Sequence, residues 1–452
     1  MKSTMLPEKL NLELLVSKRK PKFKYHNDDF AYIIGTIVSH GILYKNSSEE
    51  QFVPLNAQIL QSKIRSYNKY LAYLVENKVL ITDWIYIVGK KSRGYQLHST
   101  YVNSSIVEYT FSKKVFIKKG EEKKRKAKLD KEYGYLTRWF NSNLKINERS
   151  SVRYLLLRRT TERRQGIKNF LQRWSQATIR VAMINKGEFR LSVDDTGKRF
   201  HSNLTNLNSE LRKFITYDGL TLAAVDVKNS QLFFSILLLT SRFYEKNAEG
   251  LTLFNISPRI YQEIISWIPS ILSVIAENTT SIMLVKSDET QCQSDIELYC
   301  TLVDKGKIYS FLRNEYFEYT GSFYDLEDPK QKSELKEHVF INIYSKNSTK
   351  TEMKRIFGDH FPKVQKIFGL LKKDDHTRLA AILQLIESEI IVRTAAKRFS
   401  EKYPFAPVYT IHDSIATLSA HKLDIYNEIK AACLDTFELM PSLSTEDWRV
   451  KR

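Results

Sequence analysis

Apolar residues recur at helical spacing over several long stretches of this chain and form short runs between them. The clearest helix near the N-terminus has four apolar residues three or four positions apart, with Asn56 able to cap it: Ile64, Tyr67, Leu71 and Leu74. Two apolar runs follow at 79–88 and 95–101, joined by a basic loop between Gly89 and Gly94. The pattern therefore predicts a helix followed by a β-hairpin.

A helix followed by a hairpin with a basic tip is typical of a winged helix-turn-helix domain. In such a domain the helix enters a major groove, and Lys90, Lys91 and Arg93 in the tip would contact phosphates. An ordinary helix packed on a hairpin with a solvated basic turn explains the same pattern. Residues 1–112 are expected to form this domain, with DNA binding as the first hypothesis.

The basic segment 113–132 has almost no large apolar residue after Ile117. Such a segment cannot bury a face, which predicts a linker or an exposed helix. Helical periodicity then runs from 133 to about 187, with arginines dense among its polar positions. A helical arm of this kind suits a duplex backbone, although an exposed basic face without a partner is the simpler explanation.

The rest of the chain is predicted to contain both strands and helices. Residues 188–194 alternate as a strand before a turn at Asp195–Gly197. A second strand ends at Asp226 before a long apolar run, which puts this carboxylate at the edge of a sheet. Residues 377–398 predict a long helix.

Charge suggests the kind of partner. The 452 residues include 71 Lys and Arg against 51 Asp and Glu, a formal net charge of +20, so a polyanionic partner is expected. Nucleic acid fits better than a membrane, because no apolar run of about 18 residues could span a bilayer and no signal-peptide pattern occurs at the N-terminus. The 3 cysteines have no paired spacing, which favours a reducing cytoplasm over disulfides or structural zinc.

The segment after Asp195 resembles a motif of family A DNA polymerases. Thr196-Gly-Lys-Arg-Phe-His-Ser202, followed by Asn203-Leu-Thr-Asn-Leu, is similar to the Thr-Gly-Arg…Ser…Asn-Leu-Gln-Asn segment that joins thumb to palm in that family. The resemblance implies that Arg199 contacts the backbone of the primer-template, with Asn206 nearby.

Asp226-Val-Lys-Asn-Ser-Gln231 resembles motif A of the same superfamily, typically Asp-Tyr-Ser-Gln-x-Glu. At the position of Gln231 the DNA polymerases of the family have a glutamate that blocks the ribose 2′-hydroxyl, whereas phage-type RNA polymerases have a small residue. Gln231 keeps the bulk and loses the charge, which favours deoxynucleotides.

A third similarity lies in a stripe of residues four positions apart on one helix: Lys332, Lys336, Phe340 and Tyr344. An amphipathic helix with aromatic core positions would give the same pattern. Its place in the chain resembles motif B, Arg-x-x-x-Lys-x-x-x-Phe/Tyr-x-x-x-Tyr-Gly. The resemblance implies that Lys336 binds the triphosphate, Phe340 flanks the sugar and Tyr344 borders the templating base. Lys332 replaces the usual arginine and loses its bidentate geometry.

Residues 409–418 predict a tight hairpin with His412-Asp-Ser414 at its tip. These residues resemble motif C, which is His-Asp-Glu in most family A DNA polymerases and His-Asp-Ser in phage-type RNA polymerases. The resemblance implies that His412 positions the primer end. In the long helix, Gln384 matches a glutamine that reaches the primer's minor groove, although a buried, satisfied glutamine is nearly as good an interpretation.

By the same resemblance, Asp226, Val227 and Asp413 are the expected metal ligands. Two carboxylates that hold two Mg²⁺ ions about 3.5–4 Å apart let one ion activate a 3′-hydroxyl and the other stabilise the leaving pyrophosphate. Mn²⁺ could replace Mg²⁺. A cation such as Lys336 would offset charge that develops on the phosphates.

The resemblance implies an α+β fold of the right-hand palm-fingers-thumb type behind the winged helix-turn-helix domain. Its parts would be the thumb at 133–190, the palm at 191–299 with an insertion at about 241–297, the fingers and following helix at 300–400, and the rest of the palm at 401–452. The chain has no room for a 3′ to 5′ exonuclease domain, so no proofreading is expected.

The expected function is therefore DNA-dependent DNA synthesis from nucleoside triphosphates on a template-primer. The fused N-terminal domain could bind a specific duplex site, which suggests replication of a mobile element by analogy. Two alternatives stay open. Ser414 favours a single-subunit RNA polymerase, and a catalytically inactive DNA-binding replication initiator would carry the same motifs as remnants.

Overall fold

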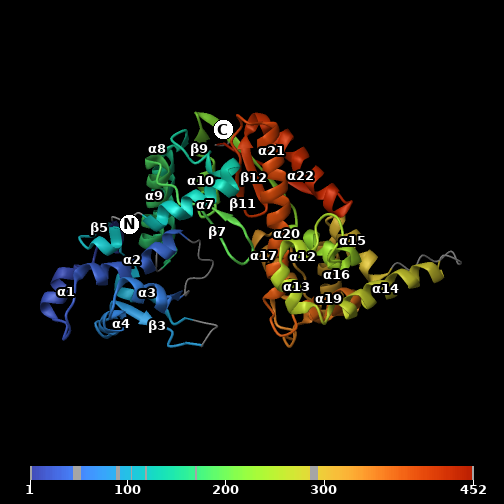
Figure 1. The fold of residues 1–452 in the computed structure, drawn as a ribbon, viewed down its shortest axis with the longest axis horizontal. Helices are drawn as coiled ribbons and strands as arrows, with labels where there is room; N and C mark the ends of the chain where they lie inside the picture. Colours follow the sequence, from blue (N-terminus) through green and yellow to red (C-terminus); the bar gives the residue numbers. More distant parts are fainter. Residues whose placement is uncertain are drawn as a thin grey trace. The chain divides into compact units, whose positions relative to one another are not determined.

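The computed structural model describes residues 3–43, 52–87, 92–102, 104–117, 120–167, 170–285 and 294–449. The chain forms two compact units, each of which combines helices with antiparallel strands (Figure 1). The first unit consists of Met1–Leu191, His201–Thr221 and Trp448–Arg452, and the second of Ser192–Phe200 and Leu222–Asp447. The mixed α and β class is thus confirmed. Among the described residues, no helix is long and apolar enough to cross a membrane.

The first unit begins with short strands interleaved with helices. Its elements up to the basic segment are β1 (Ser3–Pro7), α1 (Leu12–Lys18), α2 (Asn27–Leu43), β2 (Val53–Pro54), α3 (Ala57–Lys63), α4 (Tyr67–Glu76), β3 (Leu80–Thr82), β4 (Gly94–Leu97), α5 (Ser99–Val102) and β5 (Ile106–Thr110). An antiparallel sheet has the strand order β2-β4-β3, and β1 pairs with β5. Residues of α2, α3 and α4 bury one hydrophobic core with this sheet.

The single helix expected after Asn56 is two helices. Asn56 does cap α3, where its side chain accepts hydrogen bonds from the amides of Gln58 and Ile59. The chain then leaves the helix at Ile64, whose extended backbone precedes α4 and whose side chain is buried. The apolar periodicity continues through this break because both helices pack on the same core.

The predicted strands are also shorter in the structure. The strand expected at 79–88 ends at Thr82. The amide of Asp83 still donates to the carbonyl of Gly94, but its side chain accepts hydrogen bonds from the amides of Ile85 and Gly94, and Trp84 then adopts a left-handed conformation. The strand expected at 95–101 ends at Leu97, where the ring of His98 accepts the amide of Thr100 at the start of α5. Lys90 and Lys91 lie outside the described residues.

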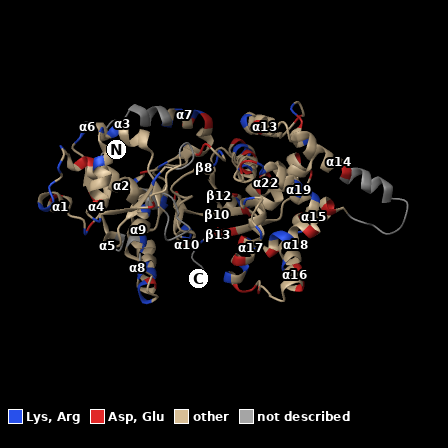
Figure 2. Cartoon of the chain, turned by 90° about the horizontal axis from the view of Figure 1, so that it is seen from below, with Lys and Arg blue, Asp and Glu red and all other residues tan. Residues whose placement is uncertain are grey.

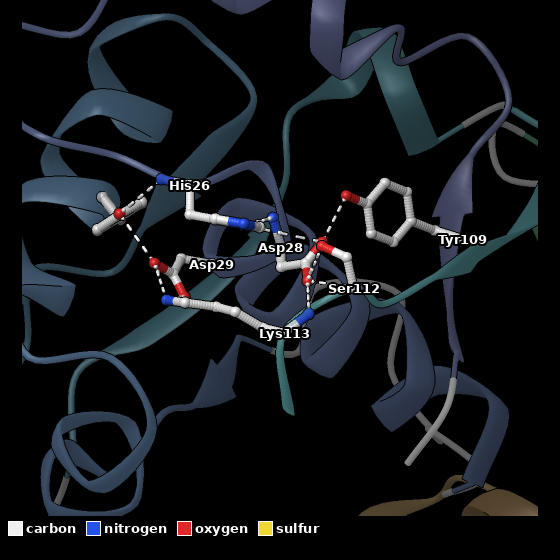
Figure 3. Close-up of polar contacts among 7 residues, drawn as sticks. His26, Asp28, Asp29, Tyr109, Ser112 and Lys113 are labelled. Carbon is white, nitrogen blue, oxygen red and sulfur yellow. Dashed lines mark hydrogen bonds and ion pairs between the residues drawn. The ribbon is translucent and has the colours of Figure 1, made fainter. Parts of the chain in front are cut away.

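Two buried aspartates in the first turn of α2 tie distant parts of this unit together (Figure 3). Asp28 is 1% exposed and accepts hydrogen bonds from the hydroxyl of Tyr109, the amide and hydroxyl of Ser112 and the amide of Lys113. The ammonium of Lys113 lies 2.6 Å from Oδ1 of Asp29. Oδ2 of Asp29 accepts a hydrogen bond from the hydroxyl of Tyr70. Burial raises the pKa of Asp28, but these hydrogen bonds outweigh it and hold the pKa below its usual value.

The described part of the basic segment 113–132 is mostly helical, and the segment is anchored at its start. It forms α6 (Lys114–Ile117) and most of α7 (Gly120–Thr137). The anchor is Lys113, whose main chain and side chain bind the two aspartates of α2. Composition alone could not show this anchor, because both acids lie more than 80 residues away in sequence.

The remaining helices of the first unit include two long ones that lie side by side (Figure 1). The elements are β6 (Leu144–Ile146), α8 (Glu148–Arg164), α9 (Phe170–Lys186), α10 (Ser209–Arg212) and β9 (Ile215–Tyr217). Blue segments in Figure 2 mark basic residues on α8. Two of the arginines in this pair are structural, since Arg158 and Arg173 both bind the buried carboxylate of Glu162.

The strand predicted at 188–194 is reduced to β7 (Ser192–Val193), which pairs with β8 (Phe200–His201). The side chain of Asn203 explains the loss, because it binds the carbonyl of Glu188 and the amide of Arg190, groups that a strand would use. The turn at Asp195–Gly197 between the two strands is confirmed.

The second unit is mostly helical around a small sheet. Its elements after β7 and β8 are β10 (Leu220–Val227, whose first two residues belong to the first unit), α11 (Ser230–Ser235), η1 (Ile236–Leu239), η2 (Ser241–Tyr244), α12 (Leu253–Ile256), α13 (Pro258–Ile264), α14 (Ile268–Val285), α15 (Asp295–Asp304), α16 (Ile308–Thr320), α17 (Pro329–Tyr344), α18 (Glu352–His360), α19 (Pro362–Leu371), α20 (Arg378–Glu387), the π-helical η3 (Ser388–Ala395), α21 (Ala396–Lys402), β11 (Tyr409–Ile411), β12 (Ser414–Leu418), η4 (Ser419–His421), α22 (Lys422–Phe437) and β13 (Leu443–Trp448). In the sheet, β11 pairs with β12, β12 with β10, and β13 with β10.

Replacing Asp28 with Asn should loosen the first unit, because an amide lacks the charge and the acceptors for four donors that burial keeps from water. We expect amide hydrogen exchange in 106–113 of the full chain to accelerate by about tenfold or more, which corresponds to about 1.4 kcal/mol or more. In the wild type the same loosening should appear only as pH falls below about 4, since a lowered carboxyl pKa stabilises the fold above the unfolded pKa. Glu76→Gln, an exposed change on α4, should leave exchange unchanged. Equal exchange in both variants would contradict a structural role for Asp28.

Candidate active site

The strand and hairpin that carry the two candidate aspartates are neighbours. β10 pairs with β12 in antiparallel register, with Asp226 opposite Ser414, and the amide of Val227 donates to the carbonyl of Asp413 at 3.4 Å. Paired strands lie about 4.8 Å apart, so the backbones of the two aspartates are adjacent. Both side chains are partly exposed, while His412 is exposed in a left-handed turn with φ of 55°. The predicted hairpin with its acid at the tip is therefore present.

A serine links the strand of Asp226 to the hairpin of Asp413. After β10, Asn229 adopts a left-handed conformation and α11 begins at Ser230. The hydroxyl of Ser230 donates to Oδ2 of Asp413 at 2.5 Å. The helix that follows the first aspartate is thereby fixed to the second one.

A buried glutamate joins three segments that are far apart in sequence. Glu387, the last residue of α20, is 1% exposed. Its Oε1 accepts from Nε of Arg199 and its Oε2 from Nη2 of Arg199, both at 2.8 Å, while Oε2 also accepts from Nε2 of Gln231 at 2.5 Å. The hairpin of β7 and β8, the start of α11 and the end of α20 therefore meet at one carboxylate.

The charges in this network affect one another. Burial raises the pKa of Glu387 to about 7, although Arg199 opposes the rise. Burial lowers the pKa of Arg199, but the negative charge of Glu387 outweighs it and holds that pKa above its usual value. The negative charge of Asp413 also raises the pKa of both Glu387 and Arg199. The network is thus electrostatically close to the candidate metal ligand.

The four-residue stripe on α17 lies on the open side of its helix. Lys332 and Lys336 are exposed, Phe340 is half-buried and Tyr344 is 42% exposed. The opposite side supplies the buried positions of the helix, Leu335, Val339, Asn342 and Ile343. The rings of Phe340 and Tyr344 are 5.5 Å apart, and Nζ of Lys336 lies 5.8 Å from the ring centroid of Tyr309. The stripe is therefore available to a ligand instead of forming the helix's core face.

Tyr344 belongs to the same cluster as the buried glutamate. Burial raises the pKa of its hydroxyl, and the negative charges of Glu387 and Asp413 add to the rise while Arg199 opposes it. Hydrogen bonds thus join the Arg199 hairpin to Gln231 through Glu387 and Ser230 to Asp413, and electrostatic effects connect Tyr344 to the same charges.

Two lysines fix the end of α17 that carries Tyr344. The ammonium of the buried Lys372 donates to the carbonyls of Asn342 and Ser345, and that of Lys354 donates to the carbonyl of Lys346. Cations at a helix C-terminus are favourable because they meet unpaired carbonyls and the negative end of the helix dipole. Burial and the charge of Lys354 lower the pKa of Lys372 to about 8.

The Arg199 hairpin is shaped and docked by local contacts. The side chain of Asp194 accepts hydrogen bonds from the amides of Thr196, Gly197 and Arg199. The carbonyl of Gly197 accepts from the hydroxyl of Ser388 at 2.6 Å. A Cβ at Gly197 would lie 2.7 Å from Cβ of Gln384, so glycine permits this close approach to the long helix.

The structure brings some of the predicted site residues together in the second unit and places others in the first. Six residues lie at the site in the second unit: Arg199, Asp226, Gln231, Tyr344, Gln384 and Asp413. Asn206 is half-buried in the first unit, between β8 and α10, and Arg93 is exposed there in the loop before β4.

Sequence reasoning missed Glu387, Ser230 and Lys372. A signal existed only for Glu387, since a charged residue at this position interrupts the apolar face formed by Leu383, Ile386 and Ile390. The other two are ordinary polar residues whose partners are fixed only by the fold.

The donor set suits a hard cation. Among the residues that the structure describes, no group of three or more His, Cys, Asp or Glu side chains could hold a metal ion by itself. Mg²⁺ does not need such a cage, because it is usually bound by one or two carboxylates and completed by water and substrate phosphates. Asp226 and Asp413, adjacent and partly exposed, fit this requirement.

No family model and no curated protein match the chain. Among solved structures, it is similar to the POL domain of Pol1 from M. smegmatis in complex with DNA primer-template and dNTP. The identity is 11% and the TM-score 0.27, over 62% of this chain and 52% of that chain. This chain therefore spans about half the length of that structure. A TM-score this low does not establish a shared fold.

Replacing Gly197 with Ala should push the Arg199 hairpin away from α20, because the new methyl group would overlap Cβ of Gln384. We expect the free energy of unfolding to fall by about 1–3 kcal/mol, measured by thermal or denaturant unfolding of the full chain. Gly134→Ala is the matched control, since nothing lies within 4 Å of its Cβ and alanine favours a helix. A wild-type stability for Gly197→Ala would show that the hairpin is not tightly docked.

Proposed function

We propose that the chain is a nucleotidyltransferase, a DNA-dependent DNA polymerase of the family A type without a proofreading exonuclease. The observation that carries this proposal is the meeting of residues from separate motif-like segments. Arg199 and Gln231 both bind Glu387, Ser230 binds Asp413, and the negative charges of Glu387 and Asp413 raise the pKa of Tyr344. The proposal includes the palm, fingers and thumb arrangement, with α8 and α9 in the thumb and α17 in the fingers.

In this proposal α17 binds the nucleoside triphosphate. Lys336, with Lys332 one turn before it, neutralises the phosphates, and both are exposed. Phe340 flanks the sugar and Tyr344 borders the templating base. Gln231 is the residue beside the sugar that limits access of a 2′-hydroxyl.

The primer-template would be held by residues outside α17. Nε and Nη2 of Arg199 are bound to Glu387, so its contact with the primer-template would use Nη1. Gln384 and Asn206 are further proposed contacts. His412, exposed in its turn, would position the primer end.

Asp226 and Asp413, with Val227 beside them, are the proposed ligands of two Mg²⁺ ions, which Mn²⁺ could replace. When bound, the ions would activate the primer 3′-hydroxyl and stabilise charge on the leaving pyrophosphate. The protein's part is to hold the two carboxylates together through the pairing of β10 with β12 and the bond from Ser230.

Primer extension with Mg²⁺ and either dNTPs or NTPs tests the function. We expect incorporation of dNTPs, and a loss of about a thousandfold or more in rate for Asp226→Asn and for Asp413→Asn, with duplex binding intact. Asp435→Asn, an exposed change on α22, should stay active. Incorporation of NTPs alone would favour a single-subunit RNA polymerase, which Ser414 keeps as the alternative. No incorporation on several templates would leave the inactive replication initiator.

The first unit supports a second part of the proposal, duplex binding by a winged helix-turn-helix domain. Helices α3 and α4 are separated by a three-residue turn at Ile64–Ser66, and the hairpin of β3 and β4 follows them. The guanidinium carbon of the exposed Arg93 lies 5.4 Å from the ring centroid of Trp84, which is 70% exposed. An exposed cation held over an aromatic ring suits contact with a phosphate backbone. A duplex-binding domain on a polymerase would suit replication of a mobile element in the cytoplasm.

Replacing Arg93 with Ala should weaken duplex binding by about three- to tenfold and reduce the magnitude of the salt slope by about 1, because one phosphate contact is lost. Fluorescence anisotropy of the full chain with a labelled duplex at several salt concentrations measures both quantities. Lys18→Ala removes an equally exposed charge from the end of α1 and should have little effect. Equal losses in the two variants would indicate a general charge effect instead of a hairpin contact.

A further inference from the structure

We propose that Glu387 is a positioning residue that sets the sugar preference of the site, by holding Gln231 in one orientation against Arg199. The inference rests on the proposed polymerase function and deepens it. Sugar choice would then depend on the pair of Gln231 and Glu387, and not on the size of residue 231 alone.

The burial of this pair determines how the amide of Gln231 is oriented. Oε2 of Glu387 accepts from Nε2 of Gln231, and both side chains are at least nine-tenths buried. Oε1 of Gln231 is buried and has no hydrogen-bond partner among the described residues. An unsatisfied buried acceptor costs about 1–3 kcal/mol, so this orientation needs the carboxylate to favour it.

Arg199 makes the carboxylate a rigid support. Its guanidinium binds both oxygens of Glu387 in a side-on pair, which fixes the plane of the carboxylate. The oxygen that receives Gln231 is one of the two that Arg199 holds. The position of the Gln231 side chain is therefore set by the ion pair behind it.

Glu387 is also connected, through the start of α11, to a candidate metal ligand. Ser230 and Gln231 are consecutive residues at the start of α11, and they bind Asp413 and Glu387, respectively. Two carboxylates from different elements thus hold one turn of helix. If Glu387 no longer binds Gln231, this side chain can rotate while Ser230 and the two aspartates remain in place.

A released Gln231 would no longer form a fixed wall beside the sugar, so a 2′-hydroxyl would be admitted more easily. The measured quantity is the ratio of kcat/KM for a dNTP to that for the matching NTP, in primer extension by the full chain. We expect Glu387→Gln to lower this ratio by at least tenfold, because it removes the charge that orients both neighbours. Gln231→Glu should also lower it, since two buried carboxylates would then repel each other.

The double variant Gln231→Glu with Glu387→Gln restores one carboxylate and one amide in the buried pair. We expect its ratio to return to within about threefold of the wild-type value. Tyr244→Phe is the structural control, because it removes a buried hydrogen bond to the carbonyl of Leu238 in the same unit, outside the hydrogen bonds of Arg199, Gln231 and Glu387. It should lower the melting temperature and leave the ratio unchanged.

The outcomes separate this inference from the proposed function. Absence of any incorporation by the wild type would overturn the polymerase proposal itself. An active wild type whose ratio is unchanged in Glu387→Gln would overturn the inference and leave the polymerase standing. A ratio that falls equally in Tyr244→Phe would assign the effect to lost stability, which also overturns it. Should Glu387→Gln not fold, Glu387→Asp keeps the charge, withdraws the carboxylate by one methylene and is judged by the same ratio.

Discussion

The pairing of β10 with β12 is the constraint on which the rest of the site depends. Five residue pairs, from Leu222 opposite Leu418 to Asp226 opposite Ser414, set the register of the two strands. Most of these side chains are buried, so a slip by one residue would turn apolar groups to the wrong face and is strongly disfavoured. The register brings Asp226 beside the hairpin of Asp413, and α11 then starts where Ser230 can reach that hairpin. The geometry of the candidate site is thus fixed by the same packing that stabilises the sheet.

The second constraint is the cost of burying the carboxylate of Glu387. A buried charge is tolerated only when it is paired and hydrogen-bonded, and here Arg199 and Gln231 supply both conditions. Arg199 can reach the carboxylate because Asp194 shapes the turn before it and Gly197 lets the hairpin approach the helix. The chain turns π-helical directly after Glu387. This geometry is rare in proteins overall, but where it occurs it is often at a functional site. Polar groups here hold the geometry together, and their loss would leave buried charge unpaired.

These contacts explain which parts of the molecule could be predicted from sequence. The strand of Asp226, the hairpin of Asp413 and the stripe on α17 follow from local periodicity, and the structure contains all three. The break at Ile64 was hidden because the apolar spacing continues through it. The partnership of Arg199 with Glu387 spans 188 residues, and no spacing rule connects them. Local signals located the elements, whereas the long-range polar contacts that align them required the fold.

The same contacts change what the net charge means. A formal charge of +20 suggests a large basic surface, yet several cations are already paired with buried acids. Lys113 binds Asp29, Arg158 and Arg173 bind Glu162, and Arg199 binds Glu387. Cations used in this way neutralise buried acids and cannot also neutralise phosphates at full strength. Lys336 on α17 and Arg93 in the hairpin are exposed, so they suit the proposed phosphate contacts better than Arg158 and Arg173, which are bound to Glu162.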